Sequence, residues 1–487
     1  MSAWGLAARL KPPLPLVGKV LTPLGVALLC AALLGGLALG TLSGLVPALH
    51  SNTLALVVLI CQGGIAGLLL RLDPFEGVAL LPWVLALLIL GSMLTHIVVA
   101  ILPATFLGIP EDDTLASLLP AQRLAAVGRG AEAIGASVRG AVLGAMLGLP
   151  LVVVPAVLVA ATATPAQLQL VRALLRGLLV AVVCALVLTQ PKEGSGKLTP
   201  GSILGATAVV AATVGLGMLL WGHWPTFVPL VDHPLPGAQI AFFALFGGVF
   251  AVPSLVAVLL PPSTGEPPSR GGAPSIGSAL PLHLLVRSVL AGGLLAWAAG
   301  LGNAQATRLS MGRSEEGGPT ATQDYLLASS AINTVNALGG VALWWTFGWQ
   351  RSGGIAALAV GLGQAPGHRP PGDLATTGSL AALLGALLLI VLMAGALALR
   401  LGRWLEGRRS RRPSRMLHAI LLGYLISGAV LLGGGSGLLL LLCSSLVGML
   451  PLLWRVGRVH LMAILIVPVL LGGQLPTVIG ECVAPAC

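Results

Sequence analysis

The sequence predicts an all-α integral membrane protein of about 12 transmembrane helices, with re-entrant or broken segments and a weak two-fold internal repeat that we expect to be inverted. Two properties of the composition lead to this fold class: 56% of the 487 residues are hydrophobic and only 8% are charged. Soluble domains carry about 25% charged residues. The composition therefore excludes a soluble enzyme and predicts a multi-pass protein of the cell membrane, in contact with membrane lipid.

Apolar windows recur along the chain, and roughly 20 apolar residues are long enough to cross a bilayer. The windows lie at residues 21–45, 54–70, 77–102, 140–161, 171–188, 203–221, 240–260, 284–301, 325–345, 377–399, 416–432, 437–453 and 461–471. Trp344 and Trp345 end one of them, and tryptophans are enriched at the membrane–water interface. We therefore expect this pair to anchor a helix end at the membrane surface.

The net charge of +11 comes from basic residues that cluster between the apolar windows. Lysine and arginine are enriched in the cytoplasmic loops of membrane proteins. We expect the loop 401–415 and the N-terminal segment 1–20 to be cytoplasmic, and we expect no nucleic-acid partner.

The chain divides into two halves with matched motifs. The motif PALHSNT (47–53) aligns with AGLGNAQ (299–305), and VGRGAEAIGA (127–136) aligns with WQRSGGIAAL (349–358). Matched interrupted segments in two halves point to the binding site of a transporter. We predict a first transmembrane half, connecting loops and helices, a second half, and C-terminal helices with a tail, at 21–190, 191–281, 282–400 and 416–487. The predicted site segments are 43–53, 103–130, 299–305 and 329–353.

Glycines four residues apart mark two helix faces. The first series is Gly36, Gly40 and Gly44, and the second is Gly140, Gly144 and Gly148. Small residues at this spacing let two helix backbones approach closely in lipid. We expect both series to pack against other helices.

The motifs of both halves resemble those of a known family. The first half carries GTLSGLVPALHSNTLA (40–55) and ILPATFLGIPEDDTLASLLPAQRLAAVGRGAEAI (101–134), and the second carries INTVNALGGVALWWTFGWQRSGGIAAL (332–358). These blocks are similar to the large membrane subunit of the tripartite tricarboxylate transporters, in the divergent form found in archaea. The resemblance covers roughly residues 20–400. It implies a cation-coupled secondary transporter of a tri- or dicarboxylate, with an extracytoplasmic binding protein and a small membrane subunit as partners.

The chain departs from the family pattern at the first turn of each half. The Pro-Gly pair of the family is Pro47-Ala48 here, and its second-half counterpart is Ala299-Gly300. Glycine permits backbone conformations that alanine resists. The resemblance therefore does not specify the geometry of the site or the substrate.

Two arginines are candidate ligands for a substrate carboxylate. Arg129 and Arg351 each precede a glycine or serine at a predicted helix start, one in each half. A guanidinium offers a two-pronged donor that matches a carboxylate. The alternative is that each is an ordinary arginine of a cytoplasmic loop.

Four further polar residues are candidate substrate ligands within apolar surroundings. Asn333 and Asn336 share a helix face because they are three residues apart, and His50 and Asn52 follow a glycine-rich window. Polar groups at membrane depth are costly unless they line a cavity or are buried in protein. The alternatives are hydrogen bonds between helices for the asparagines and a helix-end role for His50, which could instead carry a proton.

Three adjacent acidic residues follow a Gly-Ile-Pro break at 108–110, in a chain with only 15 acidic residues. Asp112, Asp113 and Thr114 offer the oxygen ligands that hard cations prefer. We predict that they bind the coupling ion, Na⁺ or H⁺, or face the entry to the site. Equally, acidic residues at a helix start stabilise the helix dipole without any ligand.

Other function classes find less support in the sequence. It contains neither a His-Glu-x-x-His motif nor a phosphate-binding loop, and we expect no cofactor, no metal site and no enzymatic activity. The alternatives are an intramembrane lipid-modifying enzyme, a transporter of an unrelated small organic substrate, and a channel or structural protein.

Overall fold

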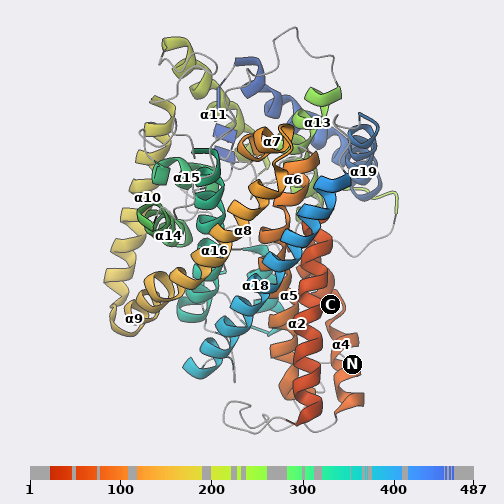
Figure 1. Ribbon diagram of the computed structural model, residues 1–487, viewed down its shortest axis with the longest axis vertical. Coiled ribbons are helices and arrows are strands. Elements are labelled where there is room, and N and C mark those ends of the chain that lie inside the picture. The colour runs from red at the N-terminus through yellow and green to blue at the C-terminus, as the bar shows by residue number, and fades with distance from the viewer. Residues whose placement is uncertain are drawn as a thin grey trace.

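The described residues of the computed structural model form helices and no strand, which confirms an all-α fold (Figure 1). The structure describes residues 22–46, 51–73, 77–107, 118–188, 199–220, 227–231, 237–259, 282–298, 302–311, 321–350, 352–364, 368, 370, 374, 376–408, 415–454, 456–457, 460–461 and 463–464.

The first half contains four helices of 19 to 24 residues, several short ones and one π-helical turn. Its elements are α2 (Pro23–Leu45), α3 (Ser51–Ile60), α4 (Gln62–Leu72), α5 (Gly77–Val99), α6 (Ile101–Leu107), α7 (Leu118–Ala126), α8 (Gly130–Gly148), η1 (Leu149–Val153), α9 (Val154–Thr162) and α10 (Pro165–Leu188).

The remaining elements follow a similar alternation of long and short helices. They are α11 (Pro200–Leu220), α12 (Gly237–Phe246), η2 (Gly247–Ala251), α13 (Val252–Leu259), α14 (Leu282–Trp297), α15 (Asn303–Met311), α16 (Ala321–Phe347), α17 (Gly353–Gly361), α18 (Thr377–Arg408) and α19 (Arg415–Trp454).

Seven helical stretches in the described part of the chain are long and apolar enough to cross a membrane. They are Pro23–Leu45, Ala79–Leu107, Gly130–Thr162, Pro200–Leu219, Thr322–Phe347, Thr377–Arg408 and His418–Trp454. Two predicted windows, 240–260 and 284–301, form shorter apolar helices. The windows 416–432 and 437–453 form the two helical parts of α19, which are separated by a kink at Gly434 (φ 60°, ψ −147°). The chain is a multi-pass membrane protein.

Helices α5 and α16 form the centre of the molecule. In the spans that contain α5 and α16, 89% of the most apolar 18-residue window is buried inside the protein. In the other five spans the buried share is 22–44%. A helix that is hydrophobic all round belongs in a protein interior or in lipid. Here both helices contribute to one large apolar core, from Leu80 and Leu90 of α5 to Val341 of α16, while the surrounding spans leave one face exposed.

The two halves share an arrangement that the first motif alignment predicts. In each half a glycine-rich helix packs along a central helix, α2 along α5 and α14 along α16. In the sequence, the short helices α3 and α4 lie between α2 and α5, and the short helix α15 lies between α14 and α16. The alignment of 47–53 with 299–305 places Ser51 opposite Asn303. These are the first residues of α3 and α15. The alignment is confirmed at the level of helix starts.

The second motif alignment is wrong. It matches the start of α8 with the start of α17, but α17 has 9 residues, whereas α8 continues through η1 and α9 into a stretch of 33 residues. The 32-residue helix α18 is the counterpart of α8 by length and packing: α8 packs along α16, and α18 packs along α5, so each crosses to the other half. The shared motif predicts a helix that starts after a glycine-containing turn, but it does not predict how long that helix is.

Both glycine series form helix–helix contacts, as predicted. In α2, a Cβ at Gly40 would stand 3.0 Å from the Cα of Ser92 in α5, and one at Gly44 would stand 3.2 Å from the carbonyl oxygen of His96. In α8, a Cβ at Gly144 would stand 2.8 Å from the Cα of Ala331 in α16. The backbones of α2 and α5, and of α8 and α16, are therefore in direct contact.

The two adjacent tryptophans lie in the core, so the expectation of an interfacial anchor is wrong. Trp344 is fully buried, and its Nε1 donates to Oε1 of Gln364 at 2.8 Å. The Nε1 of Trp345 donates to the carbonyl oxygen of Leu374 at 2.6 Å. Because the segment after α17 supplies an acceptor to each indole, neither needs the polar membrane surface.

Two helices contain a π-helical turn directly before a Val-Pro pair. In the first, the N–H of Val154 donates to the carbonyl oxygen of Leu149, ahead of Pro155. In the second, the N–H of Val252 donates to the carbonyl oxygen of Gly247, ahead of Pro253. Proline removes one helical hydrogen bond and crowds the preceding turn, and the wider turn accommodates it.

Candidate functional site

The start of α17 is held by a residue of the other half. Oδ1 of Asn52, in the first turn of α3, accepts the N–H of Gly354 at 2.9 Å. Ser352 caps the same helix, because its Oγ accepts the N–H of Ile355 at 3.2 Å. Two of the first-turn N–H groups, which have no partner within a helix, are thus bound by side chains. The predicted ligand Asn52 is therefore engaged with the protein through its carboxamide oxygen.

The start of α15 is held by α16 of the same half. Nδ2 of Asn303 donates to Oγ of Ser329 at 3.1 Å, and the backbone N–H of Gly302 donates to Oε1 of Gln305 at 2.6 Å. Thr307 donates to the carbonyl oxygen of Asn303 at 2.8 Å. The first turn of α15 is thus a buried polar cluster against the middle of α16.

Asn333 and Asn336 lie on the same face of α16 as Ser329. The spacings of four and three residues place the three side chains along one side of the helix. Asn333 is only 5% exposed and Asn336 is half-buried. Neither carboxamide is among the fully buried side-chain groups that lack a hydrogen-bond partner in the described part of the chain. Substrate binding by these amides therefore stays a prediction that rests on their position in α16.

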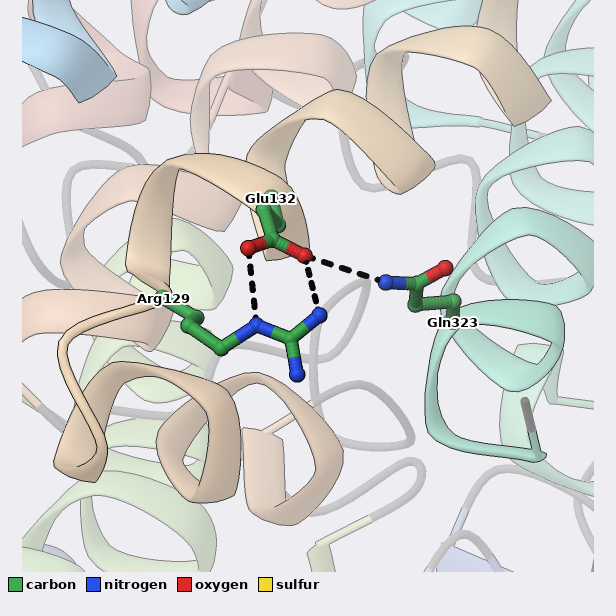
Figure 2. A network of polar contacts seen from close by, with 3 residues as sticks. All are labelled: Arg129, Glu132 and Gln323. Atoms are coloured by element: carbon green, nitrogen blue, oxygen red, sulfur yellow. Dashed lines mark hydrogen bonds and ion pairs between the residues drawn. The ribbon is translucent and has the colours of Figure 1, made fainter. Parts of the chain in front are cut away.

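Arg129 lies in a different polar cluster, shown in Figure 2. Its Nε and Nη2 donate to the two carboxylate oxygens of Glu132 at 2.7 and 2.6 Å. Nε2 of Gln323, in the first turn of α16, donates to Oε2 of Glu132 at 3.2 Å. The hydrogen bonds with Glu132 raise the pKa of the Arg129 guanidinium, which stays charged. The hydrogen bond from Gln323 connects this forked ion pair, at the start of α8, to the start of α16.

The structure does not bring all predicted ligands into one cluster. Gln323 and Asn333 are ten residues apart in α16, which corresponds to about 15 Å along the helix axis. Arg129 contacts the Gln323 end, and Asn333 belongs to the cluster of Ser329 and Asn303. The substrate-binding roles of Arg129, Asn52, Asn333 and Asn336 stay predictions. The remaining candidates lie outside the described residues: His50, Asp112, Asp113, Thr114 and Arg351.

Sequence reasoning missed several residues of these clusters. Glu132 had a usable signal, because it stands three residues after Arg129 in a chain with few acidic residues, and this spacing favours an ion pair on a helix. Gln323 and Ser329 offered no such signal, because each bonds to an element far away in the sequence. No group of metal-binding side chains is found among the described residues.

The comparisons with known proteins identify the family. Residues 30–463, nearly the whole chain, match the family described as "Tripartite tricarboxylate transporter TctA family". The chain belongs to the TctA family. An uncharacterized protein of Methanocaldococcus jannaschii is 32% identical over 100 residues, which are 20% of this chain and 21% of that relative. The chain thus matches about a fifth of the length of that relative. No solved structure matches the chain.

Membership of the TctA family gives the protein a class of function. TctA is a family of tripartite tricarboxylate transporters, so the class of function of the family is membrane transport. The resemblance in the sequence motifs is confirmed over most of the chain.

Proposed function

We propose that the protein is the permease of a cation-coupled secondary transporter for a tri- or dicarboxylate, with its binding site between the starts of α15 and α17 and the middle of α16. The observation that carries this proposal is the nearly complete burial of Asn333 in the central helix α16, one turn after the Ser329 that binds the start of α15. A transporter needs buried polar side chains at membrane depth to bind its substrate, whereas a purely structural membrane protein has no use for them.

The chemistry of this region suits a carboxylate. Carboxamide N–H groups are donors for an anion, and the helix dipole favours negative charge near a helix start. Arg351 stands directly before Ser352, the cap of α17, and would supply the forked donor. His50 stands directly before Ser51, the first residue of α3, and would serve as a further donor.

Arg129 supports the proposal less directly, because Glu132 already binds its guanidinium by two hydrogen bonds. A substrate carboxylate would have to replace Glu132 or share the arginine with it. We propose that Arg129 binds substrate only in a conformation in which this ion pair opens.

The proposal also covers the ion that drives transport and the proteins that deliver the substrate. Asp112, Asp113 and Thr114 would bind the coupling ion, Na⁺ or H⁺, since hard cations prefer such oxygens. An extracytoplasmic binding protein would deliver the carboxylate, and a small membrane subunit would assemble with the permease. Support for both partners comes from the family.

The test is uptake of labelled citrate and succinate into liposomes that contain the purified protein, under an inward sodium gradient and then a proton gradient. We expect gradient-dependent uptake in the wild type and at least a tenfold loss in the Asn333→Ala and Arg351→Ala variants. Gln169→Ala, which removes an exposed amide from α10, is the matched control and keeps wild-type uptake. Undiminished uptake by Asn333→Ala would remove that residue from the site. Absence of uptake by the wild type, even with the neighbouring subunits added, would contradict carboxylate transport.

A further inference from the structure

Both ends of α17 are hydrogen-bonded to the α3–α4 segment of the other half. At the start, Asn52 accepts the N–H of Gly354 at 2.9 Å, as described above. At the end, Nε2 of Gln62, the first residue of α4, donates to the carbonyl oxygen of Gly361 at 2.7 Å. The bonded residues are 302 and 299 positions apart in the sequence. A short helix of the second half is thereby attached to the first half at two points.

The two contacts define how the helices lie. Asn52 is the second residue of the ten-residue helix α3, and Gln62 follows the end of that helix, so α3 and the nine-residue α17 run parallel and in register. At 1.5 Å per residue both are about 14 or 15 Å long. A Cβ at Gly353 would lie 2.7 Å from Cγ of Asn52, and one at Gly361 would lie 3.2 Å from Cδ1 of Leu59. Glycine at both ends of α17 therefore permits the close approach that the hydrogen bonds need.

Each amide matches the polarity of the helix end that it binds. The start of α17 carries free N–H groups and partial positive charge, and its end carries free carbonyl groups and partial negative charge. Asn52 presents an oxygen to the positive end, and Gln62 presents an N–H to the negative end. This pair of contacts is directional, because reversing either amide would place like partial charges together.

We propose that Asn52 and Gln62 are positioning residues that clamp α17 to α3–α4, so that the three helices move as one rigid body during transport. The clamp crosses the boundary between the halves, and it sets the place of Ser352 and, through the chain, of Arg351. Asn52 acts here through α17 and not by touching substrate. This inference rests on the proposed function for its consequence in transport, but the clamp itself can be tested without uptake.

Charge substitutions separate a positioning role of Asn52 from a substrate-binding role. Asn52→Asp keeps an acceptor and adds negative charge at a helix start, where it is favourable. We expect uptake within about threefold of wild type for Asn52→Asp, and a loss of at least tenfold for Asn52→Leu. If Asn52 touched the substrate, the aspartate would repel the carboxylate, and Asn52→Asp would be at least as damaging as Asn52→Leu. That result would overturn the proposal.

Substitutions of Gln62 should affect uptake in the opposite order, and they serve as the matched control for the substitutions of Asn52. Gln62→Glu replaces a donor by an acceptor opposite the carbonyl oxygen of Gly361, at the negative end of the helix. We expect Gln62→Glu to lose at least tenfold in uptake and Gln62→Leu to lose less. An acid is thus tolerated at residue 52 and not at residue 62. Wild-type uptake by Gln62→Glu would contradict the clamp.

A distance measurement tests the clamp whether or not the chosen carboxylate is transported. Spin labels at Val57 of α3 and Ala356 of α17, in a variant with its six native cysteines replaced by alanine, report the separation of the two helices by double electron–electron resonance. We expect one narrow distance that is unchanged between a sodium gradient and none, and a broad distribution after Gln62→Glu. A labelled pair whose distance shifts with the gradient in the otherwise unmodified chain would show that α3 and α17 do not move together.

Discussion

Two of the interfaces that join the halves of this protein are built in different ways. Between α8 and α16, Gly140, Gly144 and Gly148 lie against the backbone or side chains of Leu327, Ala331 and Val335. Between α3 and α17, carboxamide side chains bind the two ends of a short helix. The first interface is a continuous contact of surfaces, and the second is defined at two points.

The difference shows how each interface is specified in a membrane. Lipid tails are as apolar as leucine, so helices associate there by close packing and hydrogen bonds and not by the hydrophobic effect. A glycine face gains dispersion energy along its whole length and is broken by a single added side chain. A hydrogen bond at each end fixes the register of α17 against α3. We therefore expect α8–α16 to be the more stable junction, and α3–α17 to depend on its two amide side chains.

The largest effect is expected at the α8–α16 interface. In Gly140→Leu the new side chain would meet the backbone of Leu327, which cannot move aside, and we expect a loss of at least ~3 kcal/mol in stability. Size-exclusion chromatography of the detergent-solubilised protein should show aggregate in place of a single peak. Gly135→Leu in the same helix is the control, because a Cβ at Gly135 has no neighbouring atom within 4 Å. Equal behaviour of the two variants would contradict the close packing of α8.

A smaller effect is expected at the start of α17, where two adjacent glycines differ. A Cβ at Gly353 would stand 2.7 Å from Cγ of Asn52, whereas one at Gly354 would have its nearest neighbours at 3.7 Å. Gly353→Ala should displace Asn52 and cost about 1 kcal/mol, the usual value of a helix cap. Gly354→Ala should be neutral or slightly stabilising. Thermal unfolding of both variants checks this order, and a reversed order would show that Asn52 does not cap α17.

The smallest effect is expected from the hydroxyl pair that links α8 to α16. The Oγ atoms of Ser137 and Ser330 are 2.6 Å apart. Hydrogen bonds between membrane helices contribute about 0.6 kcal/mol on average, so Ser137→Ala should lower stability by roughly that amount. A double-mutant cycle with Ser330→Ala measures the coupling. A coupling energy as large as the effect of Gly140→Leu would mean that hydrogen bonds, and not glycine contacts, dominate this interface.

The sequence predicts the fold class and the glycine contacts because both depend on local patterns. Apolar windows and four-residue glycine spacing can be read within one segment, and so can the shared start of α3 and α15 at Ser51 and Asn303. The role of Asn52 cannot be read in this way, because its partner Gly354 is 302 residues away. The burial of Trp344 likewise depends on Gln364, beyond a turn and another helix.

The π-helical turns before Pro155 and Pro253 have an evolutionary consequence. Such a turn holds one residue more than an α-helical path would need. Removing one residue from 149–153 would turn everything beyond it by about 100°. In α9, Leu158 now faces outward with 59% exposure and Ala156 inward with 2%. A homologue without the extra residue must therefore distribute its lipid-facing and buried side chains differently from residue 154 onward, even where the two sequences otherwise align.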